Sequence, residues 1–129
     1  MDVKIDTKER FTVITPEEAI LSANMTAELK DLLLSYLQKD MSHLILNMSF
    51  IKEIDEITGE TVASIQQKFY ENNCSFVICE LQKNVEDLLD EKELLELMNI
   101  TPTESEAQDI LQMEEIEREL TSDDEEMEN

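Results

Sequence analysis

The sequence contains few of the residues that usually mark loops, because only one glycine and two prolines occur in its 129 residues. Scarce glycine and proline predict short connections, so the periodicity of apolar residues has to mark the helices and strands. Tryptophan is absent and aromatic residues make up only 5%, which predicts a core built from aliphatic side chains. The length fits one domain and leaves no room for a second.

Basic residues are also scarce, since 10 Lys and Arg stand against 32 Asp and Glu and give a formal net charge of −22. Repulsion opposes binding to nucleic acid or to an anionic membrane, so we expect a basic or neutral protein partner. No apolar run approaches the roughly 20 residues that span a bilayer, and the first residues lack the apolar core of a signal peptide. A cytoplasmic protein without membrane insertion is therefore expected.

Residues with chemical reactivity are few. Cys74 and Cys79 are the only cysteines, and their odd spacing in a predicted strand places them on opposite faces, which predicts two buried thiols without a mutual disulfide. His43, the only histidine, begins an apolar run, which favours a structural role over a catalytic one. Carboxylate pairs such as Glu53 and Asp55 arise by chance in so acidic a chain. We predict no catalytic residue, no metal site and no cofactor.

The apolar pattern predicts elements in the order β, β, α, β, α, β, α, β, α. The predicted strands are residues 3–5, 11–14, 43–48 and 75–81, with a brief extended piece at 98–101. The predicted helices run from Asn24 or Thr26 to about Asp40, from Thr58 to about Asn72, over 85–89, and from Thr103 onward. A hairpin followed by right-handed crossovers gives an α/β fold, with a mixed sheet of four to five strands, about four helices and strand 43–48 at the centre.

The last predicted helix has a clear capping signal at its start and few apolar residues toward its end. Glu106 stands three residues after Thr103, which is the spacing of a capping box. Four apolar residues are expected to dock on the body and two more to continue the stripe weakly: Ala107, Ile110, Leu111 and Met113, then Ile116 and Leu120. Residues 122–129 are predicted to be frayed or disordered. Residues 1–113 would form the domain and 114–129 an acidic helical extension with a flexible tail, which either steers a basic partner or maintains solubility.

Residues 47–62 are the most informative segment, because an apolar strand there ends in a polar loop that leads into a helix. Open α/β sheets place ligands or partners at such junctions, where backbone N–H groups of the helix start are unpaired. Asp55 or Thr58 can cap this helix, which would explain both residues without any further function.

This segment resembles the STAS domains, a family that includes the bacterial anti-anti-sigma factors. The positions that match the family's strand, loop and helix pattern are Asn47, Met48, Ser49, Ile51, Ile54 and Asp55. The family's pattern before the first helix is similar to Leu21, Ser22, Thr26 and Leu29. The resemblance covers residue 3 to about residue 111.

The resemblance implies a protein that binds an anti-sigma factor, often a serine kinase, and so releases a sigma factor. In the family, phosphorylation of the serine after the loop aspartate abolishes binding, and here Glu56 stands at that position. Glu56 would then act as a permanent substitute for phosphate, or belong to a form that binds without kinase control. It can also be an acidic residue that simply favours the first helical turn. A third regulatory hypothesis, ranked below the two for Glu56, is that Thr58 is a displaced phosphoacceptor.

The expected binding surface is the loop 53–59 with the exposed face of the following helix, flanked by the entrance of the first helix. Its residues are Ser22, Asn24, Glu53, Asp55, Glu56, Thr58, Gly59, Glu60, Thr61 and Ser64. Asp55 would fix the loop as a cap and Glu56 would supply the charge. One alternative is a subunit of a larger assembly, such as a stress-signalling scaffold or the cytosolic partner of a lipid transporter. A small hydrolase with catalytic carboxylates has no support, and the oligomeric state is not indicated.

Overall fold

The computed structural model describes the backbone of residues 1–38 and 43–128 and the side chains of residues 1–38 and 43–120. Its elements follow the predicted order, with two added 3-10 turns, η1 and η2. They are β1 (Val3–Thr7), β2 (Thr12–Pro16), α1 (Ala23–Ser35), η1 (Tyr36–Gln38), β3 (Leu44–Asn47), α2 (Glu56–Glu71), β4 (Phe76–Cys79), α3 (Lys83–Glu91), η2 (Leu95–Leu97), β5 (Ile100–Thr101) and α4 (Glu104–Glu128). The predicted α/β fold is confirmed.

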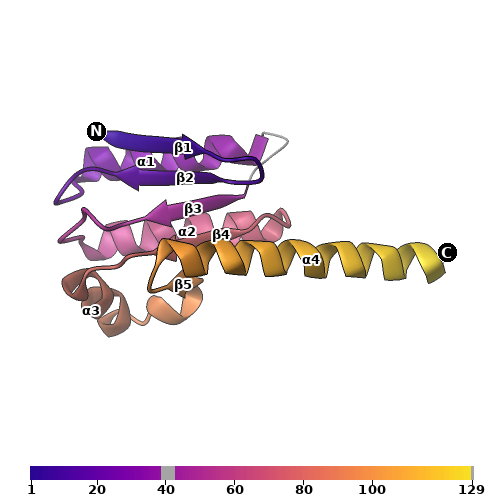
Figure 1. Ribbon diagram of the computed structural model, residues 1–129. Coiled ribbons are helices and arrows are strands. Elements are labelled where there is room, and N and C mark those ends of the chain that lie inside the picture. Colours follow the sequence, from indigo (N-terminus) through magenta and orange to yellow (C-terminus); the bar gives the residue numbers. More distant parts are fainter. Residues whose placement is uncertain (39–42, 129) are drawn as a thin grey trace.

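The five strands form one mixed sheet in the order β1-β2-β3-β4-β5 (Figure 1). β1 and β2 make the predicted antiparallel hairpin, in which Ile5 lies opposite Ile14. The pairs β2 with β3, β3 with β4 and β4 with β5 are all parallel, as right-handed crossovers require. β3 therefore occupies the centre of the sheet, which confirms the prediction for residues 43–48.

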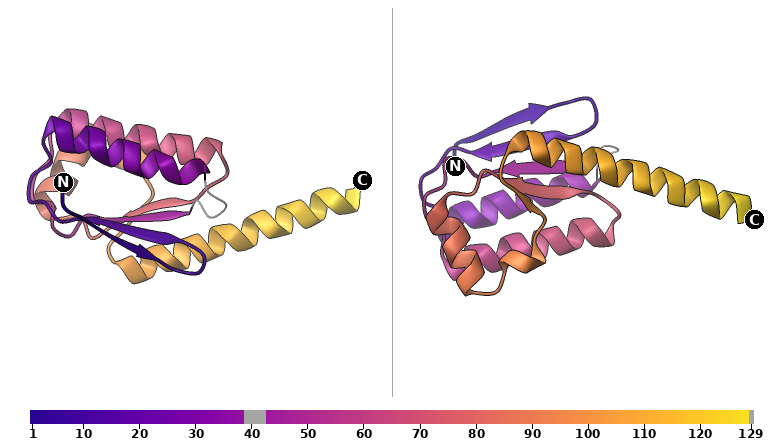
Figure 2. Two further views of the ribbon diagram at one scale, coloured as in Figure 1. Left: turned by 90° about the horizontal axis from the view of Figure 1, so that it is seen from above. Right: turned by 60° about the horizontal axis from the view of Figure 1, so that its bottom comes forward.

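Helices cover both faces of this sheet, with α1 and α2 on one side and α4 on the other (Figure 2). Along β3, Leu44 and Leu46 enter the larger core under α1 and α2, whereas Ile45 enters a second core under α4. The same alternation in β4 sends Phe76 to the larger core and Val77 to the smaller one. Because both faces are covered, these strands are continuous apolar runs and not alternating ones.

The docking of α4 follows the prediction in its first turns and departs from it afterwards. Ala107 and Leu111 are buried in the smaller core. Met113, however, is 57% exposed, so the prediction that it docks is wrong. Two residues beyond Leu111, a side chain lies about 200° farther round the helix and points away from the sheet. The predicted frayed tail concerns residues 122–129, whose side chains lie outside the described part.

Three further details correct the sequence analysis. α1 is capped by Ser22, which has the extended backbone of an N-cap, and not by Asn24 or Thr26, which lie inside the helix. α2 begins at Glu56, two residues earlier than predicted, because Asp55 provides its cap. Cys74 is half-buried, not buried. The predicted end of the first helix near residue 40 lies outside the described residues.

Candidate partner-binding surface

The loop that follows β3 is held in place from several sides. Met48 and Ile51 anchor it from below, since both side chains are fully buried. The Gln82 side chain donates a hydrogen bond to the backbone carbonyl of Ser49 at 2.7 Å. The Lys52 N–H donates to the carbonyl of Ala19 at 2.7 Å, which ties the loop to the segment before α1. The loop therefore presents its exposed side chains from a fixed backbone, which lowers the entropic cost of binding.

Asp55 ends this loop and starts α2. Its Oδ1 accepts a hydrogen bond from the Thr58 N–H at 2.8 Å, and its backbone is extended, as an N-cap requires. This N–H bond, together with the Thr58 hydroxyl, holds the pKa of Asp55 below its ordinary value, because both stabilise the carboxylate. Asp55 is thus ionised at neutral pH and fixes the first turn of α2. Its role as the cap of this helix is confirmed.

The starts of α1 and α2 meet beneath the surface. The hydroxyls of Thr26 and Thr58 lie 2.9 Å apart and form a buried hydrogen bond between the two helices. Thr58 is only 1% exposed, so neither a partner nor a kinase reaches it in the folded protein. Its predicted roles as a contact and as a displaced phosphoacceptor are therefore corrected to a structural role.

Gly59 is likewise buried and serves packing. A Cβ atom at this position would lie 3.0 Å from Leu94 Cδ1 and 3.1 Å from Leu89 Cδ2. The absence of a side chain therefore lets α2 approach α3 and the following turn closely. As with Thr58, a direct contact to a partner does not fit the structure, and Gly59 supports the surface from within.

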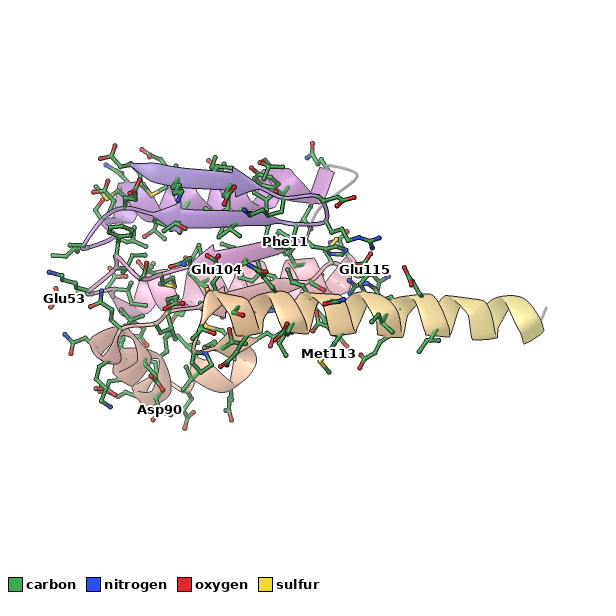
Figure 3. All side chains as sticks on the ribbon, in the orientation of Figure 1. Phe11, Glu53, Asp90, Glu104, Met113 and Glu115 are labelled. Carbon is green, nitrogen blue, oxygen red and sulfur yellow. The ribbon has the colours of Figure 1, made fainter. Side chains whose placement is uncertain are left out.

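The other predicted residues come together at this end of the molecule, where Figure 3 places Glu53. Those with exposed side chains are Ser22, Asn24, Glu53, Asp55, Glu56, Glu60 and Ser64, whereas Thr61 is half-buried. The Thr61 hydroxyl donates to the backbone carbonyl of Ile57, one turn earlier in the same helix, at 2.8 Å. The Glu56 side chain is 53% exposed, and one of its oxygens lies 3.9 Å from the ammonium group of Lys92.

Three exposed apolar side chains on this surface were not predicted. Ile20 is 57% exposed, Phe50 is 49% exposed and Ile57 is 68% exposed. Ile20 lies next to the loop, because it forms a β-bridge with Glu53. Of these three residues, only Ile57 could have been predicted to be exposed from the sequence. It lies off the apolar stripe of Val62, Ile65 and Phe69 that packs α2 on the sheet. We call these three residues with the seven exposed polar ones the loop–helix surface.

The described residues contain no candidate metal centre. Within residues 1–38 and 43–120, no group of three or more His, Cys, Asp and Glu side chains is placed to hold a metal ion. His43 lies at the opposite ends of the strands, where its Nδ1 accepts a hydrogen bond from the Ser75 N–H at 3.1 Å. Burial and the charge of Arg118 lower the pKa of His43, so the imidazole is neutral at pH 7. None of the helices in the described part is both long and apolar enough to cross a membrane.

The mixed sheet, the helix cover and the capped junction after β3 define an α/β domain, and comparison gives its family. Residues 2–107 match the STAS domain model, so the chain belongs to the STAS domain family. The resemblance that the sequence analysis drew from residues 47–55 is thereby confirmed.

Solved structures support the same fold. The chain is similar to a proposed anti-sigma factor antagonist from Thermotoga maritima, with 18% identity, a TM-score of 0.76 and coverage of 85% of this chain and 94% of that one. It is also similar to a serine-to-glutamate variant of RsbS from Moorella thermoacetica, with 20% identity, a TM-score of 0.73 and coverage of 87% and 96%. A stressosome protein chain has 17% identity, a TM-score of 0.65 and coverage of 84% and 96%. No curated protein sequence matches this chain.

Proposed function

We propose that this chain is a regulatory binding module without catalytic activity, which acts as an antagonist of an anti-sigma factor in the bacterial cytoplasm. The observation that carries the proposal is the loop–helix surface, where Ile20, Phe50 and Ile57 are exposed on an anchored backbone. Exposed apolar residues with a polar rim are typical of protein interfaces. The similarity to a proposed anti-sigma factor antagonist from Thermotoga maritima supports this choice of partner.

Glu56 takes the position of the regulatory serine in this proposal. It lies in the first turn of α2, beside exposed Ile57, and so borders the apolar part of the surface. A partner that covers Ile57 also meets the charge of Glu56. We propose that Glu56 makes binding independent of a kinase, because a single carboxylate carries less charge than a phosphoserine, about −1 against −1.5 to −2.

The test is a binding measurement between this chain and an anti-sigma factor of the serine-kinase type from the same cell, by isothermal titration. Ile57→Gln should weaken binding about tenfold or more, since burying an aliphatic side chain contributes about 1.5–3 kcal/mol. The matched control is Tyr70→Gln at the far end of the same helix, where the side chain is 75% exposed and outside the proposed surface. Equal effects of the two substitutions, or no binding by either the unaltered protein or the Glu56→Ser variant, would refute the proposal.

Glu56→Ser separates the two regulatory hypotheses in the same assay. If Glu56 permits binding without kinase control, the wild-type protein binds and the serine variant binds with similar affinity until a kinase phosphorylates it. A serine variant that binds while the wild-type protein does not would show that Glu56 imitates phosphate and holds the protein in an inactive state.

A second candidate is a subunit of a larger signalling assembly, which the similarity to a stressosome protein chain favours. This alternative uses the same fold and predicts a different size of complex. Size-exclusion chromatography of the tagged protein from its own cells distinguishes the two: a complex of one or two small partners supports the antagonist, and a very large particle supports the assembly.

A further inference from the structure

α4 carries a second exposed apolar stripe, remote from the loop–helix surface. Met113 is 57% exposed, Ile116 is 48% exposed and Leu120 is 60% exposed. Their spacing of three and then four residues places them on one side of the helix, away from Ala107 and Leu111, which pack on the sheet. Figure 1 shows that the C-terminal part of α4 extends beyond the sheet. We call Met113, Ile116 and Leu120 the α4 stripe.

The helix that presents this stripe is firmly attached to the body by polar contacts on its inner side. Ser75 Oγ donates to Glu114 Oε1 at 2.6 Å, and Arg118 Nη2 donates to Ser75 Oγ at 3.1 Å. Arg10 Nη1 lies 2.6 Å from Glu115 Oε1 and joins the helix to the β1–β2 hairpin. Figure 3 shows Met113 and Glu115 on opposite sides of α4. The apolar stripe is therefore held outward by contacts made on the other sides of the helix.

A groove adjoins the stripe where α4 passes the hairpin. It has a volume of about 420 Å³, and Ile116 contributes to both the groove and the stripe. Its apolar lining comes from Phe11, Leu111 and Ile116, and its polar lining includes His43, Glu119 and the ion pair of Arg10 with Glu115. Because Ile116 belongs to both, a partner that covers the stripe can also place an apolar side chain in the groove.

The charge of α4 indicates what kind of partner fits. The helix contains twelve acidic residues and one basic residue, so it carries −11 of the chain's net charge of −22. Two copies of this chain would bring like charges together along the whole helix, which opposes self-association. A nucleic acid or an anionic membrane would be repelled for the same reason. A segment with both apolar and basic side chains matches the stripe and its acidic surroundings.

We infer that the α4 stripe and its groove bind a basic amphipathic segment of a second protein partner. The surface lies at the end of the molecule away from Glu53 and the loop–helix surface (Figure 3). One domain can therefore hold two partners at once, an anti-sigma factor at the loop–helix surface and the basic segment at α4. This inference is independent of the proposed function, because it uses none of the same residues.

The probe is a synthetic helical peptide of leucine and lysine, with the leucines on one face, and the comparison peptide has glutamate in place of lysine. Fluorescence anisotropy measures the dissociation constant of each peptide with the full chain. The variant Ile116→Gln with Leu120→Gln removes two apolar side chains of the stripe. Its control is Ile5→Gln with Leu97→Gln, which alters side chains of the same type and similar exposure, 45% and 59%, elsewhere on the molecule.

We expect the lysine peptide to bind the unaltered chain, and to bind the stripe variant about tenfold more weakly, while the control variant loses less than about twofold. Amide shifts in NMR should change along α4 and around Phe11 and stay constant around Ile57. Circular dichroism verifies that both variants fold.

Four outcomes overturn the inference. No binding of the lysine peptide would mean that the surface does not take a basic amphipathic segment. Equal losses in both variants would mean that the chain attracts the positive charge of the peptide without using the stripe. Binding of the glutamate peptide would contradict the role of charge. If sedimentation equilibrium shows a dimer of the unaltered chain and a monomer of the stripe variant, the surface binds a second copy of the chain.

Discussion

The cap of α2 gives a prediction that joins the fold to the loop–helix surface. Asp55→Ala removes the acceptor that lies 2.8 Å from the Thr58 N–H. Loss of an N-cap side chain costs about 0.5–2 kcal/mol, and the value here should fall in the upper half of that range. The reason is that Thr58 is only 1% exposed, so water cannot readily replace the lost partner. Ser22→Ala is the control, because Ser22 Oγ accepts from the Met25 N–H at 3.3 Å in an exposed position, and the loss should be smaller.

Urea unfolding at pH 7, followed by circular dichroism, measures this difference. A loss of about 1.5 kcal/mol lowers the midpoint by about 0.5–1.5 M for a protein of this size. The pKa of Asp55 is lowered in the folded state, so its stabilisation is fully present above the unfolded value and disappears as the pH falls through the folded value. The difference in stability between the wild type and Asp55→Ala should therefore narrow as the pH falls below about 4. A difference that stays constant from pH 7 to pH 3, or a loss no larger than that of Ser22→Ala, would refute the reasoning.

Three further predictions concern the core. Gly59→Ala gains about 1 kcal/mol of helix propensity but places a Cβ 3.0 Å from Leu94 Cδ1. We expect the free energy of unfolding in urea to fall by about 0.5–2 kcal/mol, and a rise would contradict this. Leu111→Ala should cost about 2–4 kcal/mol, because the side chain is buried under α4, whereas Met113→Ala should cost less than about 0.5 kcal/mol. Burial, with Glu104 and Glu80 nearby, raises the pKa of the Cys79 thiol to about 12. A maleimide at pH 8 should therefore modify half-buried Cys74 far faster than Cys79, and equal rates in the native protein would contradict this.

The sequence predicted the order of elements well because each buried element has a strong local pattern. Leu44 to Leu46 and Phe76 to Ile78 are apolar throughout, which indicates strands covered on both faces. Helix starts were less certain, because Ser22, Asn24 and Thr26 are all acceptable caps by residue type. Only the backbone conformation distinguishes Ser22, whose ψ of 169° is extended, from residues already inside the helix.

The candidate surface was harder to predict than the fold, because its composition depends on which side of a helix faces the sheet. Thr58 is polar and close to the loop, so the sequence suggests an exposed position. The structure turns it inward to meet the hydroxyl of Thr26, a contact between residues 32 positions apart. The exposed apolar residues Ile20 and Phe50 were missed for the opposite reason. An apolar residue in an irregular segment has no periodicity from which exposure could be inferred.

Two adjacent residues at the start of α2 therefore carry separate tasks. Asp55 bonds the helix start and determines its stability, so a change there alters the fold as well as the surface. Glu56 has its side chain 53% exposed and lies 3.9 Å from Lys92, and an exposed ion pair of this kind contributes at most about 1 kcal/mol. The charge at Glu56 can consequently change, by mutation or by replacement with a phosphorylatable serine, with little effect on folding. Because exposed Ile57 follows it directly, the same change alters the potential that an incoming partner meets. This separation of stability from surface charge is what the proposed regulatory role of Glu56 requires.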